Sequence, residues 1–266
     1  TSVMGFDPKI ILKGYTDRVE IIQNGKTQTI QTSDPFAELK KLLGKSDDQS
    51  YRYLGGAVGV VNYDAIRLVE DITDKHNSSQ PLMEFGIYDD GIIYDNLHKK
   101  LFYFYHEENR FDKIIMNDDT FGEFQSSEVT PNMDKSKFSE IVNKAKKYIH
   151  DGDIFQVVLS RKFAFDVTGD NLTLYKTLRK LNPSPYMYHL KQDTKTIIGA
   201  SPEMLVRITG DKVETFPIAG TRKVTDNEEK NKQLSEELIN DEKELAEHTM
   251  LVDLGRNDIG RVCRYG

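Results

Sequence analysis

β-Strand patterns dominate the first 106 residues of the chain. The β-rich stretches Lys9–Ile22 and Thr27–Ile30 flank the turn pair Asn24-Gly25, and this arrangement predicts a hairpin. Further strands are expected at 55–61, which is glycine-rich and apolar, and across 84–105. The order of these strands favours antiparallel pairing.

Helical periodicity takes over after residues 107–131, which are polar, weakly patterned and typical of a connecting segment. An amphipathic helix is predicted from about Ser136 to just before Gly152, and a shorter one earlier, with Ser33 or Asp34 as its N-cap. Strands interspersed with helices in this way indicate an α+β fold. The remaining predictions are a strand at 154–165, a helix at 171–181, strands at 195–208 and 212–218, and helices at 227–239 and 241–254.

Charge and composition exclude several classes of protein. The net charge of −7 argues against nucleic-acid binding, because phosphate backbones select for clustered lysine and arginine. No apolar run reaches the length of about 18 residues that a membrane helix needs, and Thr1–Lys13 lacks the pattern of a secretory signal. The single cysteine, Cys263, fits a reducing compartment, so a cytoplasmic location is expected.

Two glutamates near the C-terminal end are the first candidates for chemistry. Glu244 and Glu247 lie three residues apart on the last predicted helix, so their carboxylates share one face. Neighbouring carboxylates repel unless a cation lies between them, and Mg²⁺ is a cation that prefers oxygen ligands. Such a pair is usually solvated surface, but this helix is apolar almost all the way round and is expected to be buried.

The segment that ends in Gly220-Thr221 offers a second candidate. A glycine lets a substrate oxygen approach a backbone amide closely, and the threonine adds a hydroxyl group. Glu203 follows Ser201-Pro202 and has the chemistry of a general acid or base. An ordinary turn and an exposed glutamate explain these residues equally well when they are taken alone.

Five sequence blocks in a fixed order resemble the chorismate-utilising enzymes, most closely the large subunit (component I) of anthranilate synthase. A looser similarity covers Gly5–Pro8 and Gly55–Asp64, so the resemblance extends over nearly the whole chain. It implies a two-layer, sandwich-like core of large antiparallel sheets flanked by helices. The five blocks are Gly152–Ser160, Asn182–Met187, Ser201–Glu203, Pro217–Thr221 and Lys243–Asp258.

The resemblance implies a reaction and a set of site residues. The family's large subunits convert chorismate and ammonia to anthranilate and pyruvate, with ammonia supplied by a glutamine amidotransferase subunit in a hetero-oligomer. Glu247 matches a magnesium ligand, with Glu244 binding directly or through water. Gly220 and Thr221 match the chorismate-contacting pair, and Glu203 matches a carboxylate that protonates the leaving hydroxyl. Pro185, Tyr186 and Met187 match part of a tryptophan inhibitor pocket.

One position helps to choose among relatives. Ala219 stands where aminodeoxychorismate synthases often have a lysine that attacks the ring, whereas alanine has no nucleophile and leaves room for ammonia. Isochorismate and salicylate synthases, which use water, remain a further alternative. A non-catalytic tryptophan-binding or subunit-docking module is the alternative from a different class. Departures from the family pattern after Gly220-Thr221, in Arg222-Lys223-Val224-Thr225, affect loop details only.

The resemblance also implies that the chain is incomplete at both ends. It places residues 1–266 within one domain: a sheet region at 1–106, the polar connection at 107–131, and the first part of the catalytic region at 132–266. Family members have a catalytic histidine, further chorismate-binding residues and a second glutamate pair beyond the position of Gly266. A polypeptide of these 266 residues is therefore expected to be inactive.

Overall fold

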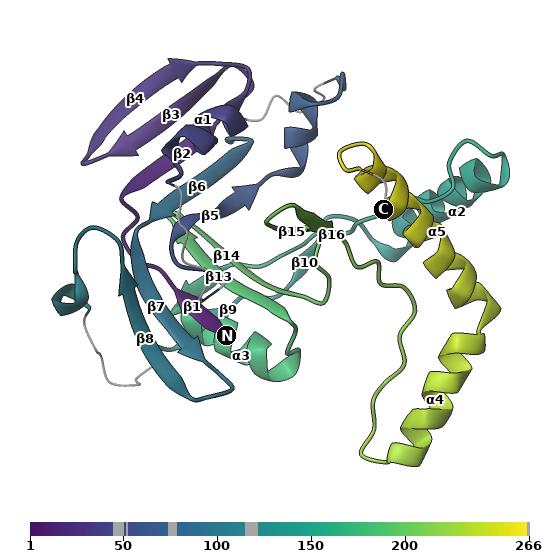
Figure 1. Cartoon of the computed structure of the whole chain (residues 1–266). Helices are drawn as coiled ribbons and strands as arrows, with labels where there is room; N and C mark the ends of the chain where they lie inside the picture. The colour runs from purple at the N-terminus through teal and green to yellow at the C-terminus, as the bar shows by residue number, and fades with distance from the viewer. Residues whose placement is uncertain (45–50, 52, 74–78, 115–121, 265–266) are drawn as a thin grey trace. The chain divides into compact units, whose positions relative to one another are not determined.

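The computed structural model describes residues 1–44, 51, 53–73, 79–114 and 122–264. The chain divides into two compact units, residues 1–118 and 119–266. All the strand pairs described are antiparallel, and helices accompany them (Figure 1), so the predicted α+β class with antiparallel sheets is confirmed.

The first unit contains a five-stranded sheet and a three-stranded sheet. The five-stranded sheet has the order β4-β3-β2-β6-β5, and the three-stranded sheet has the order β1-β7-β8. Short 3₁₀ helices lie at Tyr63–Leu68 and Phe111–Lys113. The strands are β1 (Ser2–Met4), β2 (Ile10–Gly14), β3 (Arg18–Gln23), β4 (Lys26–Gln31), β5 (Gly56–Val61), β6 (Met83–Tyr88), β7 (Asp90–Asp95) and β8 (Lys100–Tyr105).

The predicted hairpin is present, but its first stretch forms two strands. Asn24 and Gly25 have φ angles of 51° and 71° and join β3 to β4, as the turn pair indicated. The stretch Lys9–Ile22 is broken by a tight turn, in which the backbone N–H of Tyr15 donates to the carbonyl of Arg18 at 2.8 Å. A polar interruption at residues 15–17 therefore divides one long β-rich stretch into β2 and β3.

The core of the first unit lies between the five-stranded sheet and helix α1 (Pro35–Leu42). Leu12 and Met83 have no exposed surface, and Leu39 of the helix packs against them. Asp34 is the N-cap, because its carboxylate accepts a hydrogen bond from the Ala37 backbone N–H at 2.9 Å. Cap and apolar face together hold the helix on the sheet.

The second unit consists of helices and two-stranded ladders (Figure 1). Its longest ladder joins β13 to β14, from the pair Tyr186–Ser201 to the pair Gln192–Lys195. The strands are β9 (Phe124–Ser126), β10 (Thr130–Pro131), β11 (Phe163–Ala164), β12 (Val167–Gly169), β13 (Tyr186–Gln192), β14 (Lys195–Ser201), β15 (Arg207–Thr209) and β16 (Lys212–Glu214), and the helices are α2 (Lys135–His150), α3 (Asn171–Leu181), α4 (Glu228–Asn240) and α5 (Glu242–Gly260).

The helices predicted in this unit are present, although α5 extends beyond its predicted end at 254 to Gly260. The strand predicted at 154–165 is largely wrong, and the one predicted at 195–208 is divided into β14 and β15. Helix α3 has the predicted limits, and Asp170 caps it by accepting from the Leu172 backbone N–H at 2.9 Å. Of the strand predicted at 154–165, only Phe163–Ala164 pairs with another strand, namely β10. The apolar run before Phe163 has the composition of a strand, but in the described part of the chain it has no ladder partner.

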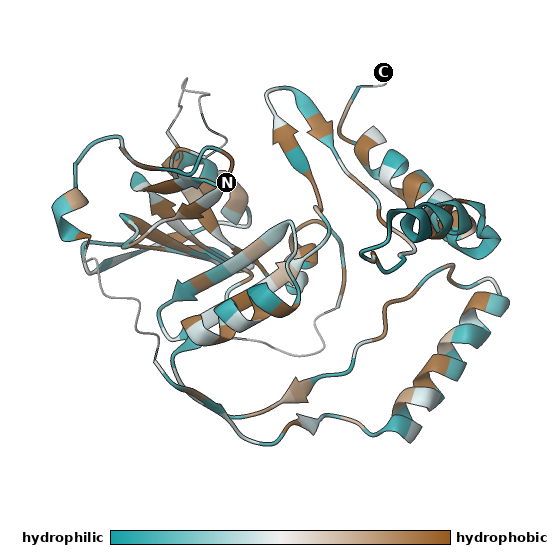
Figure 2. Cartoon of the chain, turned by 90° about the horizontal axis from the view of Figure 1, so that it is seen from below, coloured by the Kyte–Doolittle hydropathy of each residue, from teal (hydrophilic) through white to brown (hydrophobic). Residues whose placement is uncertain are grey.

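Helix α5 is not buried, contrary to the prediction from its apolar composition. None of its residues is buried, and the side chain of Leu245 is 55% exposed. Figure 2 shows hydrophobic residues concentrated in the strands of the first unit, whereas hydrophilic residues interrupt them along the helices of the second. Burial needs packing partners, and among the described residues α5 is contacted mainly by α4 and by the chain around residues 215–220. No helix in the described ranges is long and apolar enough to span a membrane.

Candidate functional site

The segment 215–221 lies in an extended conformation along helix α5. A methyl group built on Gly220 would lie 2.2 Å from the Glu244 Oε2 atom, and one built on Gly255 would lie 3.2 Å from the Thr215 Cγ2 atom. The segment therefore runs antiparallel to the helix. The lengths agree, because extended chain from 215 to 220 spans about 16 Å and helix from 244 to 255 also spans about 16 Å.

The two predicted metal ligands share the less exposed face of α5. Glu244 and Glu247 are both half-buried, whereas Leu245 and Ala246 between them are exposed. This is the face that the extended segment covers, since Glu244 contacts Gly220 directly. The structure thus places the Glu244 carboxylate beside the Gly220 backbone, and Glu247 follows it by one helical turn on the same half-buried face.

Glycine at position 220 is explained by this contact. Any Cβ atom there would collide with the carboxylate of Glu244, and Oε2, Cδ and Cγ would all lie within 3 Å of it. The colliding atoms are the flexible end of the Glu244 side chain, so a larger residue at position 220 would displace this carboxylate from the segment. The close approach of backbone and carboxylate is therefore a property of this glycine.

An ion pair joins the end of the segment to the start of α5. The Nη2 atom of Arg222 lies 2.9 Å from Asp241 Oδ2, and its Nε atom lies 2.9 Å from Glu237 Oε1. Asp241 is the N-cap of α5 and accepts from the backbone N–H groups of Lys243 and Glu244, each at 3.1 Å. The Glu244 N–H lowers the pKa of Asp241, and Arg222 lowers it further. The hydrogen bond to Glu237, followed by that to Asp241, raises the pKa of Arg222.

A second group of predicted residues meets at the β13–β14 ladder. Tyr186 pairs with Ser201 and Met187 with Ala200, so the Pro185–Met187 block lies beside the Ser201–Glu203 block. Glu203 is exposed, its backbone N–H donates to Ser201 Oγ at 3.3 Å, and the Ser201 hydroxyl donates to the Glu203 carbonyl at 2.9 Å. The turn at Glu203 is thus held by the serine hydroxyl.

The structure connects the two groups of predicted residues only indirectly. The Thr215 hydroxyl donates to the carbonyl of Leu205 at 3.1 Å, which ties the chain after Glu203 to the start of the extended segment. In the described ranges no hydrogen bond or ion pair links Glu203 to Glu244 or Glu247.

The carboxylate pair suits a magnesium ion that keeps several of its waters. No group of three or more His, Cys, Asp or Glu side chains among the described residues could hold a metal ion. The four-ligand set of Cys and His side chains that a structural zinc ion needs is therefore not formed among the described residues. Mg²⁺ is bound in many enzymes by one or two carboxylates plus water and substrate oxygens, which is the donor set that Glu244 and Glu247 provide.

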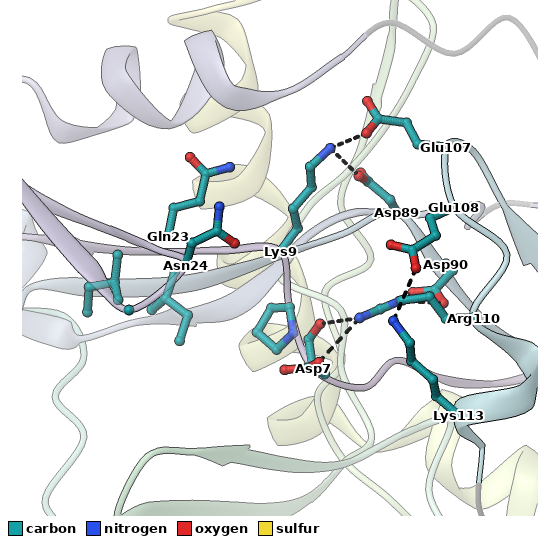
Figure 3. Close-up of a pocket in the computed structure, with 14 residues that line it drawn as sticks. Asp7, Lys9, Gln23, Asn24, Asp89, Asp90, Glu107, Glu108, Arg110 and Lys113 are labelled. Carbon is teal, nitrogen blue, oxygen red and sulfur yellow. Dashed lines mark hydrogen bonds and ion pairs between the residues drawn. The ribbon is translucent and has the colours of Figure 1, made fainter.

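The first unit contains a polar cavity of about 490 Å³, and none of the sequence-predicted site residues lines it (Figure 3). It lies where the chain passes between the two sheets of this unit. Lys9 pairs with Asp89 at 2.9 Å and also with Glu107. The other polar residues that line the cavity are Asp7, Gln23, Asn24, Asp90, Glu108, Arg110 and Lys113.

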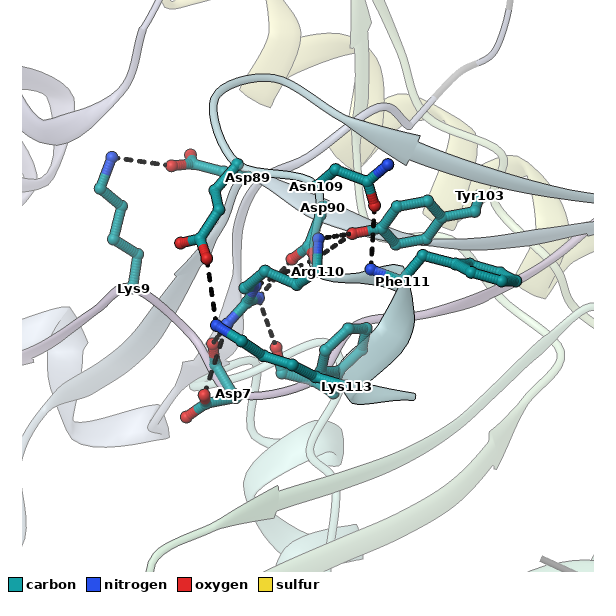
Figure 4. Close-up of polar contacts among 11 residues, drawn as sticks. Asp7, Lys9, Asp89, Asp90, Tyr103, Asn109, Arg110, Phe111 and Lys113 are labelled. Atoms are coloured by element: carbon teal, nitrogen blue, oxygen red, sulfur yellow. Dashed lines mark hydrogen bonds and ion pairs between the residues drawn. The ribbon is translucent and has the colours of Figure 1, made fainter. Parts of the chain in front are cut away.

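Arg110 is the centre of the contacts beside this cavity (Figure 4). It pairs with the buried carboxylate of Asp90 through Nε at 3.1 Å and through Nη2, and it donates to the carbonyls of Phe6 and Asp7 at 3.3 and 3.2 Å. The Tyr103 hydroxyl donates to Asp90 at 2.7 Å. Burial acts to raise the pKa of Asp90, but the hydrogen bonds from Arg110 and Tyr103 outweigh it and lower the pKa.

Sequence analysis missed this network because Arg110 falls in the polar segment 107–131. Its partners lie 20 and 103 positions away along the chain, so no local pattern indicates them. Arg110 contacts the connection between β1 and β2 through Phe6 and Asp7, the start of β7 through Asp90, and β8 through Tyr103. Arg110 is paired with the carboxylates of Asp90 and Asp7, so the arrangement is typical of a structural ion pair.

Comparison with known proteins places the chain in a family. The family model described as chorismate binding enzyme matches residues 4–266. The chain belongs to the chorismate binding enzyme family. Anthranilate synthase component 1 of Methanothermobacter thermautotrophicus is 38% identical over 100% of this chain and 57% of that relative. Aminodeoxychorismate synthase component 1 of Bacillus subtilis is 35% identical over 100% of this chain and 61% of that relative.

A solved structure of another member of the family has the same fold. The crystal structure of anthranilate synthase component I from Streptococcus pneumoniae has a TM-score of 0.75 and 32% sequence identity, over 98% of this chain and 61% of that one. This chorismate binding enzyme chain thus spans a little more than half the length of the curated relatives it matches.

Proposed function

We propose that this chain belongs to the large subunit of an anthranilate synthase, which converts chorismate and ammonia to anthranilate and pyruvate. Membership of the chorismate binding enzyme family and the identity to several relatives named anthranilate synthase component 1 support the reaction class. The contact between Gly220 and Glu244 carries the proposal. It brings together two sequence blocks that are separate along the chain and that would have to meet around one substrate.

The chemistry follows from the residues on the two sides of this contact. Glu247 and Glu244 would hold Mg²⁺, which when bound neutralises the ring carboxylate of chorismate and assists departure of the hydroxyl group. The Gly220 backbone and the Thr221 hydroxyl would orient the substrate over α5. Glu203 is the group proposed to give a proton to the leaving hydroxyl.

Ala219 would determine which nucleophile reaches the ring. Its methyl group cannot attack the substrate, so the space beside Gly220 stays open to ammonia. Aminodeoxychorismate synthase is the second candidate function, because one relative of that name is 35% identical to this chain. If the first function is correct, the Ala219→Lys variant should form less anthranilate from chorismate. It should instead give products in which the lysine has attacked the ring.

The direct test uses the full-length protein with chorismate, ammonium and magnesium. Fluorescent anthranilate is expected, and the Glu247→Gln variant should lose about a hundredfold or more of the activity, because one aimed charge is removed from the site. The matched control is Glu236→Gln on the exposed surface of α4, which should retain activity. A product without anthranilate fluorescence, or isochorismate in its place, would reject the proposal.

The proposed partners and regulation follow from the same function. A glutamine amidotransferase subunit would supply ammonia within a cytoplasmic hetero-oligomer, and tryptophan would inhibit by binding near Pro185, Tyr186 and Met187. A non-catalytic tryptophan-binding or docking module is the alternative from another class. Calorimetry on the full-length protein distinguishes them, because a module would bind tryptophan but neither chorismate nor magnesium.

We also propose that a polypeptide limited to residues 1–266 forms no anthranilate. Glu203 and Thr221 are exposed, and the face of α5 that carries the carboxylates is only half-buried. Charge stabilisation in an active site depends on groups held rigidly away from water. Anthranilate formation by this polypeptide with chorismate, ammonium and magnesium would contradict the proposal.

A further inference from the structure

We propose that Arg222 is a positioning residue that sets the register between the Ala219–Thr221 segment and helix α5. The inference rests on the proposed function, because the site it positions is the proposed magnesium and chorismate site. Arg222 follows Thr221 directly in the sequence, and its Nη1 atom donates to the Thr221 carbonyl at 3.2 Å. The guanidinium group therefore holds the backbone at the end of the segment.

The same guanidinium group holds the first turn of α5. Its Nη2 atom lies 2.9 Å from Asp241, whose other carboxylate oxygen, Oδ1, accepts from the backbone N–H groups of Lys243 and Glu244. One carboxylate thus joins the arginine to the backbone of Glu244. Since Glu244 in turn contacts Gly220, the contacts form a closed ring through the segment, the arginine and the helix.

A closed ring of this kind limits sliding between the segment and the helix. Without the ion pair, the contact between Gly220 and Glu244 has no polar bond across it among the described residues. The helix could then rotate or shift, and Glu244 and Glu247 would spread relative to Thr221. The side chains of Arg222 and Asp241 are 23% and 31% exposed. Solvent therefore screens this pair less than it screens Arg256–Asp253 within α5, whose side chains are 74% and 58% exposed.

The residue types fit this role. The planar guanidinium group binds Asp241 through Nη2 and Glu237 through Nε in a fixed geometry, whereas a lysine ammonium is a point charge on a flexible stem and would fix the two carboxylates less rigidly. Groups that orient metal-ligating side chains typically alter metal affinity by about 10- to 100-fold when they are removed. The expected consequence of losing Arg222 is weaker metal binding, with the chemistry of the ligands themselves unchanged.

The test measures manganese binding by electron paramagnetic resonance on the full-length protein without chorismate, and the magnesium dependence of anthranilate formation. Arg222→Ala should weaken Mn²⁺ binding about tenfold and raise the half-saturating Mg²⁺ concentration by a similar factor. Activity at saturating Mg²⁺ should fall far less. Arg222→Lys should lie between Arg222→Ala and the wild type, and Arg179→Ala, an exposed arginine on α3, should bind as the wild type does.

Asp241→Asn separates the ion pair from the helix cap. Asparagine caps helices about as well as aspartate, so this variant should fold normally while losing the charge that binds Arg222. It should reproduce the weaker Mn²⁺ binding of Arg222→Ala, and the double variant should be no worse than either single variant. Additive effects, or normal Mn²⁺ binding in Asp241→Asn, would overturn the role of Arg222.

Two other results have distinct meanings. A raised KM for chorismate in Arg222→Ala, with normal metal binding and a normal Asp241→Asn variant, would show that the arginine binds substrate and would overturn the positioning role. A wild-type protein that binds Mn²⁺ but makes no anthranilate would reject the proposed function instead. In that case the metal measurements on the variants would still test the ring of contacts.

Discussion

The two units of the chain differ in how their sequence features are supported. In the first unit, Leu12, Val19 and Met83 have no exposed surface, and Leu12 and Met83 pack with Leu39 of α1. In the second unit, no described residue is buried, although helix α3 has the limits that the sequence predicts. The candidate site residues all lie in this second unit. The helices of the second unit thus follow local sequence signals, without a buried core among its described residues.

The ion pairs of the two units show the same contrast. Asp90 is buried and is held by Arg110 and by the Tyr103 hydroxyl, so removing the arginine would leave a buried carboxylate without its ion-pair partner. In the second unit, Arg222 binds two carboxylates that are both partly exposed. The first kind of pair stabilises a fold, while the second acts mainly on local geometry.

The largest expected effect comes from truncating one leucine in each unit. Leu12→Ala should lower the free energy of unfolding of the first unit by about 3 kcal/mol, since it leaves a cavity against Leu39 and Met83. Leu245→Ala on α5, where the side chain is 55% exposed, should change stability by no more than about 0.5 kcal/mol. Urea denaturation followed by circular dichroism measures both. Equal losses would remove the contrast between the units.

A loss of similar size is expected when the buried ion pair is broken. Asp90→Asn should cost roughly 3 kcal/mol at neutral pH, because Arg110 keeps its charge and loses its buried partner, while the exposed carboxylate of Asp7 at 3.3 Å compensates it weakly. The control is Glu108→Gln, whose pair with Lys113 is exposed and should contribute less than about 1 kcal/mol. Urea midpoints of the three proteins give the comparison.

The pH dependence of the same variant sharpens this test. The folded pKa of Asp90 lies below its unfolded value of 3.8, so its contribution is complete above that value and is lost as pH falls through the folded pKa. The wild type should therefore lose more stability than Asp90→Asn between pH 5 and the acid limit of folding. Parallel pH profiles for the two proteins would show that Asp90 is not held as described.

The smallest expected effect compares the same helix cap in the two units. Asp34 and Asp134 each accept a backbone N–H at the third position of their helices, at 2.9 and 2.7 Å. Asp34→Ala should lower the stability of the first unit by about 1 kcal/mol, because α1 is part of its core. Asp134→Ala should instead raise amide exchange within α2 and leave the urea midpoint of the first unit unchanged, since α2 has no buried residue. Exchange followed by mass spectrometry separates these outcomes.

Local sequence signals predicted the helices well and the strands less well. Helix α3 begins after Asp170 and ends before Pro183, and both residues act on their own neighbours. A strand needs a partner elsewhere in the chain, which explains why the apolar run from Ile154 does not form a ladder before Phe163. The network of Arg110 escaped prediction for the same reason, because its partners are distant in sequence.

The sequence by itself determined the family, the helix limits, and the residues on which a magnesium and chorismate site is proposed. It contains the glutamate pair at helical spacing and the Gly220-Thr221 block, because these are patterns within short stretches. Only the tertiary structure decided that Gly220 lies against Glu244, that Arg222 joins the two blocks, and that α5 is exposed rather than buried. Such contacts depend on which distant segments pack together, and composition along one helix cannot specify that.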